Sequence, residues 1–227
     1  MRQSAVVLAR ALAFIEFADL TSGIKVPAFE LARRLTERCN FQQFPKTAKD
    51  FDIAGNGIVF EDGLMIDVPI IKFTVWNAAL VVDTRVHTSA SRAVIEDILT
   101  WGAKELGLNY VSGSIKRFAF VSDVSFFTDV PILDVSPSVR GLANRCSEEV
   151  SKIWQEPVKY EPLTVRVGHD PTARKNGIAP FMIEHRGESR FSENKYYSEA
   201  PLPTDTHWRL LEEFEKDMLI ATKGGNT

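Results

Sequence analysis

The sequence is poor in cysteine and has no long hydrophobic run. Its two cysteines, Cys39 and Cys146, lie far apart, which excludes a disulfide-based scaffold. Each falls on the apolar side of an expected helix, so we predict two reduced core thiols. No segment approaches the roughly 20 apolar residues needed to cross a bilayer. The apolar stretch at 5–9 is broken by Arg10 and lacks a clear cleavage site, so we expect a cytoplasmic chain without a membrane partner.

Neither sign of charge is in excess. The 227 residues include 27 Lys and Arg against 30 Asp and Glu, which gives a formal net charge of −3. Nucleic-acid-binding proteins usually have a basic surplus, because much of their affinity comes from neutralising phosphates, so we expect no nucleic-acid partner. The composition, 44% hydrophobic and 25% charged, is that of a globular protein that needs neither metal nor disulfide to fold.

The sequence also lacks the short motifs of the common enzyme classes. It has no Gly-x-Ser-x-Gly elbow, no Walker loop and no Gly-x-Gly-x-x-Gly fingerprint. Its four histidines form no His-x-x-x-His pair and are not accompanied by Cys-x-x-Cys, which argues against a zinc site. These absences disfavour classical hydrolases, NTPases and dinucleotide enzymes. We therefore expect no cofactor, and we favour a non-catalytic role while leaving an enzymatic one open.

Apolar periodicity predicts an α+β fold, with a mostly antiparallel sheet and four principal helices. Apolar residues recurring every three to four positions indicate the helices, and short apolar runs between turn signals indicate the strands. The helices are expected at 27–39, 91–106, 136–153 and 204–219. The strands are expected at 9–18, 58–61, 69–76, 79–86, 116–130, 163–168, 180–186 and 195–199.

The expected elements repeat in one order: strand, helix, three strands, helix. The apolar positions of the helix at 27–39 recur in the helix at 136–153 at a constant offset of 111 positions. We interpret this as an internal duplication of a β-α-β-β-β-α unit, with halves at 1–110 and 111–227. The short junction is not linker-like, so we expect one pseudo-symmetric domain. The alternative is that any two strand–helix pairs share such periodicity.

The segment 166–197 is the main candidate for chemistry. His169, Asp170 and His185 are candidates for acid–base catalysis, because the two histidines are expected near the ends of neighbouring strands and imidazole titrates near neutral pH. Nearby basic and aromatic side chains could clamp a nucleotide or another small ligand. These candidate ligand-binding residues are Arg166, Arg174, Lys175, Arg186 and Tyr196. The same pattern is equally typical of a solvated strand face with ordinary strand-end histidines.

A weaker match concerns calcium. Asp50, Asp52, Gly55 and Glu61 occupy positions one, three, six and twelve of an EF-hand loop. However, Ala54 occupies a ligand position and a strand, not a helix, is expected to follow. We therefore favour a polar turn entering a strand, and keep Asp50, Asp52 and Glu61 as a weak candidate for a metal site.

Two hypotheses for function remain. The first is a non-catalytic interaction or assembly subunit that binds another protein or itself; the apolar run at 126–133 would mark such an interface if it were exposed. The second is a small-ligand or nucleotide-binding module, with or without enzymatic activity, that uses the surface of 166–197.

Overall fold

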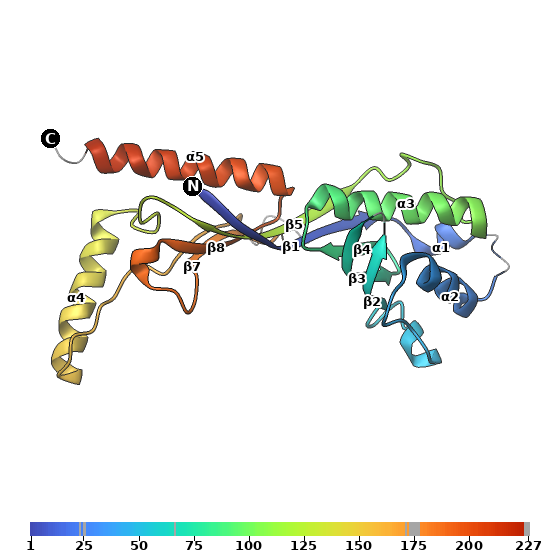
Figure 1. Cartoon of the computed structure of the whole chain (residues 1–227), viewed down its shortest axis with the longest axis horizontal. Helices are drawn as coiled ribbons and strands as arrows, with labels where there is room; N and C mark the ends of the chain where they lie inside the picture. Colours follow the sequence, from blue (N-terminus) through green and yellow to red (C-terminus); the bar gives the residue numbers. More distant parts are fainter. Residues whose placement is uncertain (23, 25, 66, 171, 173–177, 225–227) are drawn as a thin grey trace. The chain divides into compact units, whose positions relative to one another are not determined.

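The fold is mixed α+β, as the sequence predicts. The computed structural model describes residues 1–22, 24, 26–65, 67–170, 172 and 178–224. This part of the chain contains five α-helices, two short 3₁₀ helices and eight strands (Figure 1). The strands form an antiparallel sheet in the order β2-β3-β4-β1-β5-β8-β7-β6. No helix in the described ranges is long and apolar enough to cross a membrane.

The boundaries of the elements are as follows. The strands cover Arg2–Phe14 (β1), Ile58–Met65 (β2), Val68–Trp76 (β3), Ala79–Thr84 (β4), Phe118–Phe127 (β5), Thr164–Val167 (β6), Phe181–His185 (β7) and Lys195–Ala200 (β8). The α-helices cover Phe17–Thr21 (α1), Ala28–Cys39 (α2), Thr88–Leu106 (α3), Pro137–Trp154 (α4) and Thr204–Gly224 (α5). The 3₁₀ helices cover Ala48–Phe51 (η1) and Phe191–Glu193 (η2).

The elements differ from the sequence expectation mainly at their ends. The N-terminal strand was expected over 9–18, but it ends earlier because the chain turns into α1, which buries Leu20. The helix α3 begins three residues before its expected start. There the ring of His87 accepts a hydrogen bond from the backbone N–H of Ser89 at 3.1 Å and caps the first turn.

The chain divides into two compact units. Unit 1 comprises residues 1–5, 123–201 and 205–227, and unit 2 comprises 6–122 and 202–204. The strands β1 and β5 contribute residues to both units. The predicted halves at 1–110 and 111–227, and their packing as one pseudo-symmetric domain, stay predictions.

The core of unit 2 lies between its strands and the helices α2 and α3. Phe41, Phe60 and Phe73 form an aromatic cluster with ring centroids 5.3 to 6.4 Å apart. Cys39 is fully buried there, with its Sγ 3.7 Å from the Sδ of Met65. Burial raises the pKa of the Cys39 thiol to about 12, so this cysteine is the unreactive core thiol that the sequence predicts.

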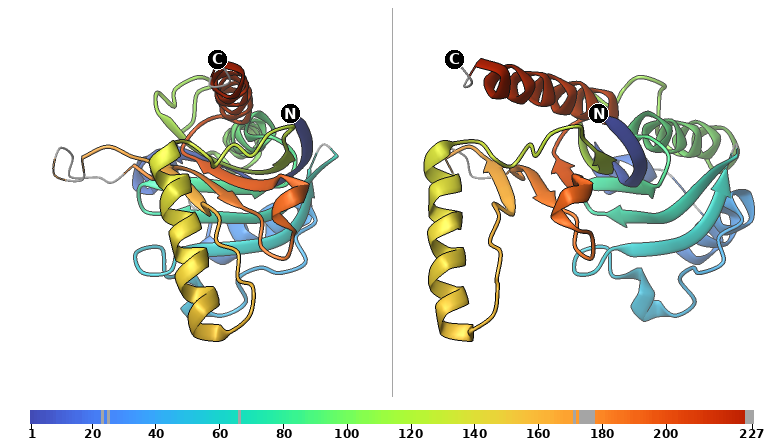
Figure 2. Two further views of the ribbon diagram at one scale, coloured as in Figure 1. Left: turned by 90° about the vertical axis from the view of Figure 1, so that its left-hand side faces the viewer. Right: turned by 60° about the vertical axis from the view of Figure 1, so that its left-hand side comes forward.

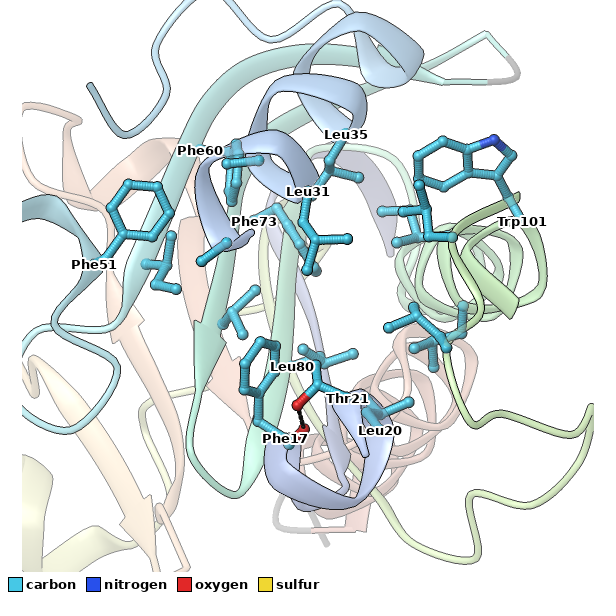
Figure 3. Close-up of a pocket in the computed structure, with 18 residues that line it drawn as sticks. Phe17, Leu20, Thr21, Leu31, Leu35, Phe51, Phe60, Phe73, Leu80 and Trp101 are labelled. Carbon is cyan, nitrogen blue, oxygen red and sulfur yellow. Dashed lines mark hydrogen bonds between the residues drawn. The ribbon is translucent and has the colours of Figure 1, made fainter. Parts of the chain in front are cut away.

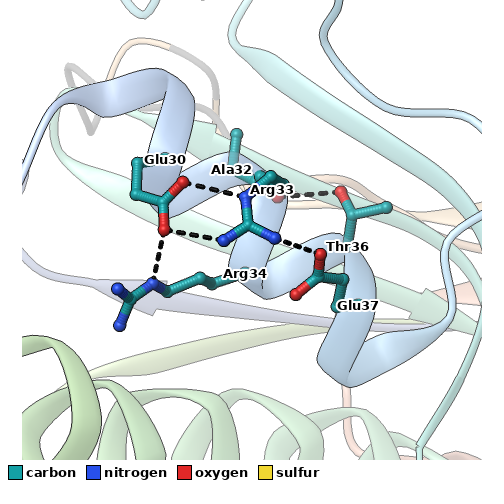
Figure 4. Close-up of polar contacts among 6 residues, drawn as sticks. All are labelled: Glu30, Ala32, Arg33, Arg34, Thr36 and Glu37. Carbon is teal, nitrogen blue, oxygen red and sulfur yellow. Dashed lines mark hydrogen bonds and ion pairs between the residues drawn. The ribbon is translucent and has the colours of Figure 1, made fainter.

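The outer face of α2 carries a network of ion pairs (Figure 4). The carboxylate of Glu30 accepts hydrogen bonds from Arg33 at 2.8 Å and from Arg34 at 2.7 Å. Arg33 also pairs with Glu37 one turn further along the helix. The hydrogen bonds from Arg33, followed by those from Arg34, lower the pKa of Glu30 from its ordinary 4.5 to about 2.

The substitution Arg33→Gln tests this network. Because the pKa of Glu30 is lowered, its contribution to stability is present above pH 4.5 and is lost as the pH falls through about 2. We expect NMR titration of the Glu30 carboxyl to give a midpoint near 2 in the wild type and a higher midpoint in Arg33→Gln. The matched control Arg92→Gln, which removes the partner of Glu96 on α3, should leave the Glu30 midpoint unchanged. A wild-type midpoint near 4.5 would contradict the network.

In unit 1, α5 packs on one face of the strands β5, β7 and β8. His207 of α5 is fully buried, and its Nε2 lies 2.8 Å from the Oγ of Ser198 on β8. Its ring meets that of Phe181 edge-on at 5.2 Å, and Trp208 meets Phe126 in the same way at 6.0 Å. These aromatic contacts make up much of the core of the unit.

Candidate functional site

The structure does not bring His169 and His185 together. Val167 at the end of β6 pairs with Phe181 at the start of β7, so His169 lies near the loop between the two strands. His185 lies at the opposite end of β7, where its backbone N–H donates to the carbonyl of Leu163 at 2.9 Å. The two histidines are separated by the length of the strand, so the acid–base pair predicted from the sequence does not form.

His169 and Asp170 serve their own loop instead. The ring Nδ1 of His169 donates to the carbonyl of Asp170 at 2.8 Å, and its Nε2 accepts from the backbone N–H of Ile178 at 3.1 Å. The carboxylate of Asp170 accepts two hydrogen bonds from Thr172, which lower the pKa of Asp170. Both side chains are exposed and stabilise a turn.

The predicted ligand-binding residues that the structure describes do not form one cluster. Arg174 and Lys175 lie outside the described residues. Arg166 is exposed on the edge strand β6. The guanidinium of Arg186 lies 5.7 Å from the centre of an aromatic ring of β8. Tyr196, by contrast, is buried.

His185 and Tyr196 do come together, on the wall of a pocket in unit 1. They are directly opposite each other on β7 and β8, with ring centroids 6.1 Å apart. The pocket has a volume of about 390 Å³. Its other lining residues include Asp134, Arg140, Lys159, Glu161, Phe191 and Asn194.

The pocket contains a buried polar atom with no hydrogen bond. The Nε2 of His185 has no hydrogen-bond partner among the described residues, while the ring packs against Phe191 at 4.7 Å. Leaving such an atom unpaired costs about 1–3 kcal/mol, so this nitrogen is a natural contact for a polar ligand or a water molecule. The sequence singled out His185 but gave no sign of this environment.

A cluster of charges lies on another wall of the pocket. Arg140 pairs with Asp134 at 2.7 Å and with Glu161 at 2.5 Å, and Lys159 pairs with Glu161 at 2.5 Å. Burial acts to raise the pKa of Glu161, but the hydrogen bonds from Lys159 and Arg140 outweigh it and lower this pKa. Two acids and two bases leave no net charge, so the wall can orient a polar ligand without selecting for either sign of charge.

The helix α4 presents a second feature, an apolar stripe on its surface. Of its 18 residues, Ala143 alone is buried. The stripe consists of Val139, Leu142, Cys146, Val150 and Ile153, of which Val139 is 39% exposed, Leu142 57% and Ile153 76%. An amphipathic helix normally buries its apolar side, so within unit 1 this side lacks a covering.

The adjacent side of α4 is covered by the segment 155–163, which runs back along the helix (Figure 2). The hydroxyl of Ser147 accepts from the backbone N–H of Tyr160 at 2.8 Å, and that of Ser151 accepts from Val158 at 2.8 Å. Hence the contacts that hold the covered side of α4 are mainly polar, and the apolar stripe stays outside.

Two apolar segments differ from the sequence expectation. The periodicity of the helix at 136–153 predicts a side turned to a core that includes Cys146, but Val139, Leu142 and Ile153 are exposed and Cys146 is only half-buried. Apolar periodicity does not distinguish a side that faces a core from one that faces an interface. The run at 126–133 would mark an interface only if it were exposed. Its residues Phe126, Ile132 and Leu133 are instead buried, since they fill the core of unit 1.

The carboxylates of the calcium-like match are used in local hydrogen bonds. Asp50 accepts from the backbone N–H groups of Lys46 and Thr47 and caps η1. Asp52 accepts from Gly55, and Glu61 pairs with a lysine of β3 at 3.4 Å. In the described ranges no group of three or more acidic, histidine or cysteine side chains could hold a metal ion. These contacts favour the polar turn.

Unit 2 contains an apolar hollow between α2, α3 and the sheet (Figure 3). Its volume is about 100 Å³, and aliphatic and aromatic side chains such as Leu31, Leu35, Phe73 and Trp101 line it. The hydroxyl of Thr21 donates its hydrogen bond to the carbonyl of Phe17 at 2.9 Å, so it has no hydrogen left to donate to a ligand. The hollow is therefore a dry packing gap.

The substitution Ala32→Leu tests this gap. Ala32 lies on the wall of the hollow, so the added carbons should fill existing space. We expect the free energy of unfolding to stay constant or to rise by up to about 1 kcal/mol. The matched control Ala11→Leu, at a buried position of β1 away from the hollow, should cost about 1–3 kcal/mol through overpacking. If urea unfolding gives the same loss of unfolding free energy for both variants, the hollow has no space for the added carbons.

Comparison with known proteins adds no relative: no protein-family model matches the chain, and a search of curated proteins finds no significant match.

Proposed function

We propose that this chain is a non-catalytic interaction or assembly subunit that binds another protein through α4. The observation that carries the proposal is the apolar stripe, defined by Val139, Leu142, Cys146, Val150 and Ile153, which lies largely open on a well-formed helix. Fully burying a side chain such as leucine or isoleucine contributes about 1.5–3 kcal/mol. A partner that covered the stripe would gain this free energy several times over, less the cost of association.

A comparison with α2 supports the proposal. At the offset of 111 positions, Leu31 and Leu35 of α2 correspond to Leu142 and Cys146 of α4. The helix α2 packs this stripe on its own sheet, burying Ala32, Leu35 and Cys39. The helix α4 carries the same pattern with its stripe largely open. A side that is apolar in both helices but covered in one fits a helix that completes its packing on a partner.

We also propose that the two helices descend from a duplicated β-α-β-β-β-α unit. When α1 and the 3₁₀ helices are set aside, this order occurs once from β1 to α3 and again from β5 to α5. The strand order supports the idea. Counted inward from the two ends of the sheet, β2 corresponds to β6, β3 to β7, β4 to β8 and β1 to β5.

We place the protein in the cytoplasm, where unpaired thiols stay reduced, and expect neither nucleic acid nor membrane as its partner.

A photo-reactive amino acid at position 142 tests the interaction. In cells that express the chain, we expect this probe in place of Leu142 to form a covalent adduct with a protein upon illumination, because position 142 is an exposed position of the stripe. The matched control is the same probe in place of Glu148, which is exposed on the opposite side of α4. No adduct at 142, or equal adducts at both positions, would contradict a protein interface here.

A second candidate function is small-ligand binding in the pocket of unit 1, supported by the unpaired Nε2 of His185. With AMP as a nucleotide probe, we expect NMR shifts at His185 and Tyr196, and we expect His185→Ala to abolish the shift at Tyr196 with little change in Tm. The control His169→Ala, in a loop at the far end of β7, should bind as the wild type does. Unchanged binding in His185→Ala would exclude the pocket.

A further inference from the structure

We infer that the partner of α4 is a second copy of this chain, bound with its α4 antiparallel about a two-fold axis beside Cys146. This inference rests on the proposed function and names its partner. The spacing of the apolar stripe, the charges along its edge and the length of the helix support it.

The apolar stripe is symmetric about Cys146. Leu142 and Val150 lie four residues before and after it, and Val139 and Ile153 lie seven residues before and after it. An antiparallel copy turned about Cys146 therefore places Leu142 against Val150 of the second copy, and Val139 against Ile153. A two-fold interface requires such a self-complementary surface, because each contact must occur twice.

The charges beside the stripe are arranged about nearly the same point, since Arg145 and Glu149 are centred on Ser147, one residue after Cys146. Arg145 and Glu149 lie one turn apart along one edge of the stripe, and both are exposed. In an antiparallel helix pair, corresponding edges of the two helices meet, so Arg145 lies against Glu149 of the second copy, and the reverse. Arg145 makes no ion pair with any described residue of its own chain, and Glu149 pairs with Lys152 at the surface at 2.6 Å. The pairing thus gives Arg145 a partner of opposite charge.

The small size of the surface favours a weak dimer. A helix of 18 residues is about 27 Å long, and one pair of such helices covers less than the 1,200–2,000 Å² of a typical stable interface. We therefore expect a reversible dimer that dissociates upon dilution, in place of an obligate one.

Sedimentation equilibrium tests the dimer directly. Between about 1 and 200 µM, we expect the wild type to pass from monomer to dimer. The variant Leu142→Glu should stay monomeric, because it places two charges in the apolar contact. The matched control Leu64→Glu replaces a leucine of β2 that is 48% exposed in unit 2, and it should dimerise as the wild type does. Circular dichroism checks that both variants are folded.

The two cysteines make the register testable. Cys39 is buried, so Cys146 is the thiol that a short bis-maleimide reagent reaches first. We expect this reagent to link two wild-type chains through Cys146, and to link neither Cys146→Ser nor Leu142→Glu.

Exchange of the charges at positions 145 and 149 gives a second test of the register. Arg145→Glu should weaken the dimer roughly tenfold, and the double variant Arg145→Glu/Glu149→Arg should restore it.

Several results would overturn the inference. A wild type that stays monomeric at all concentrations excludes self-association, and so does a dimer that Leu142→Glu does not affect. A dimer without the Cys146 link, or without rescue by the double variant, excludes the antiparallel register. The proposed function fails separately, because it requires the photo-reactive probe at position 142 to form adducts. Adducts with a different chain, together with a monomeric wild type, would reject the second copy and retain the interface.

Discussion

The orientation of α4 depends on the polar contacts that hold it against the segment 155–163. The hydroxyl groups of Ser147 and Ser151 accept hydrogen bonds from backbone N–H groups of that segment, and Arg140 pairs with Glu161. These contacts fix the rotation of the helix about its own axis. Ala143, which lies among them, is turned inward, and the apolar stripe is turned outward. Because hydroxyl groups and charges cover one side, the apolar side is left for another surface.

The same contacts shape the pocket of unit 1. Arg140 belongs to α4 and also to the cluster of charges that lines the same pocket as His185. Its pairing with Asp134, opposed in part by burial, raises the pKa of Arg140, so this side chain stays charged at every ordinary pH. A ligand in the pocket and a partner on α4 would therefore share one structural element. The two candidate functions concern neighbouring parts of the same unit.

The α+β class and the four long helices could be predicted because each helix has strong apolar periodicity, as in α2 and α4. The ends of elements could not, because they depend on single contacts such as the ring of His87 on Ser89. The exposure of Leu142 was missed because periodicity indicates that a face will be covered but not by what. The pairing of His185 with Tyr196 depends on strand register, which is set by contacts far apart in sequence.

The central claim is that another protein surface covers the stripe on α4, and that this surface is a second copy. Hydrogen–deuterium exchange, measured at low and high protein concentration, tests it on the unmodified chain. We expect amides of α4 to exchange more slowly at high concentration, while those of α2, whose stripe is already buried in its own unit, keep the same rates. Equal rates for α4 at both concentrations would contradict the claim.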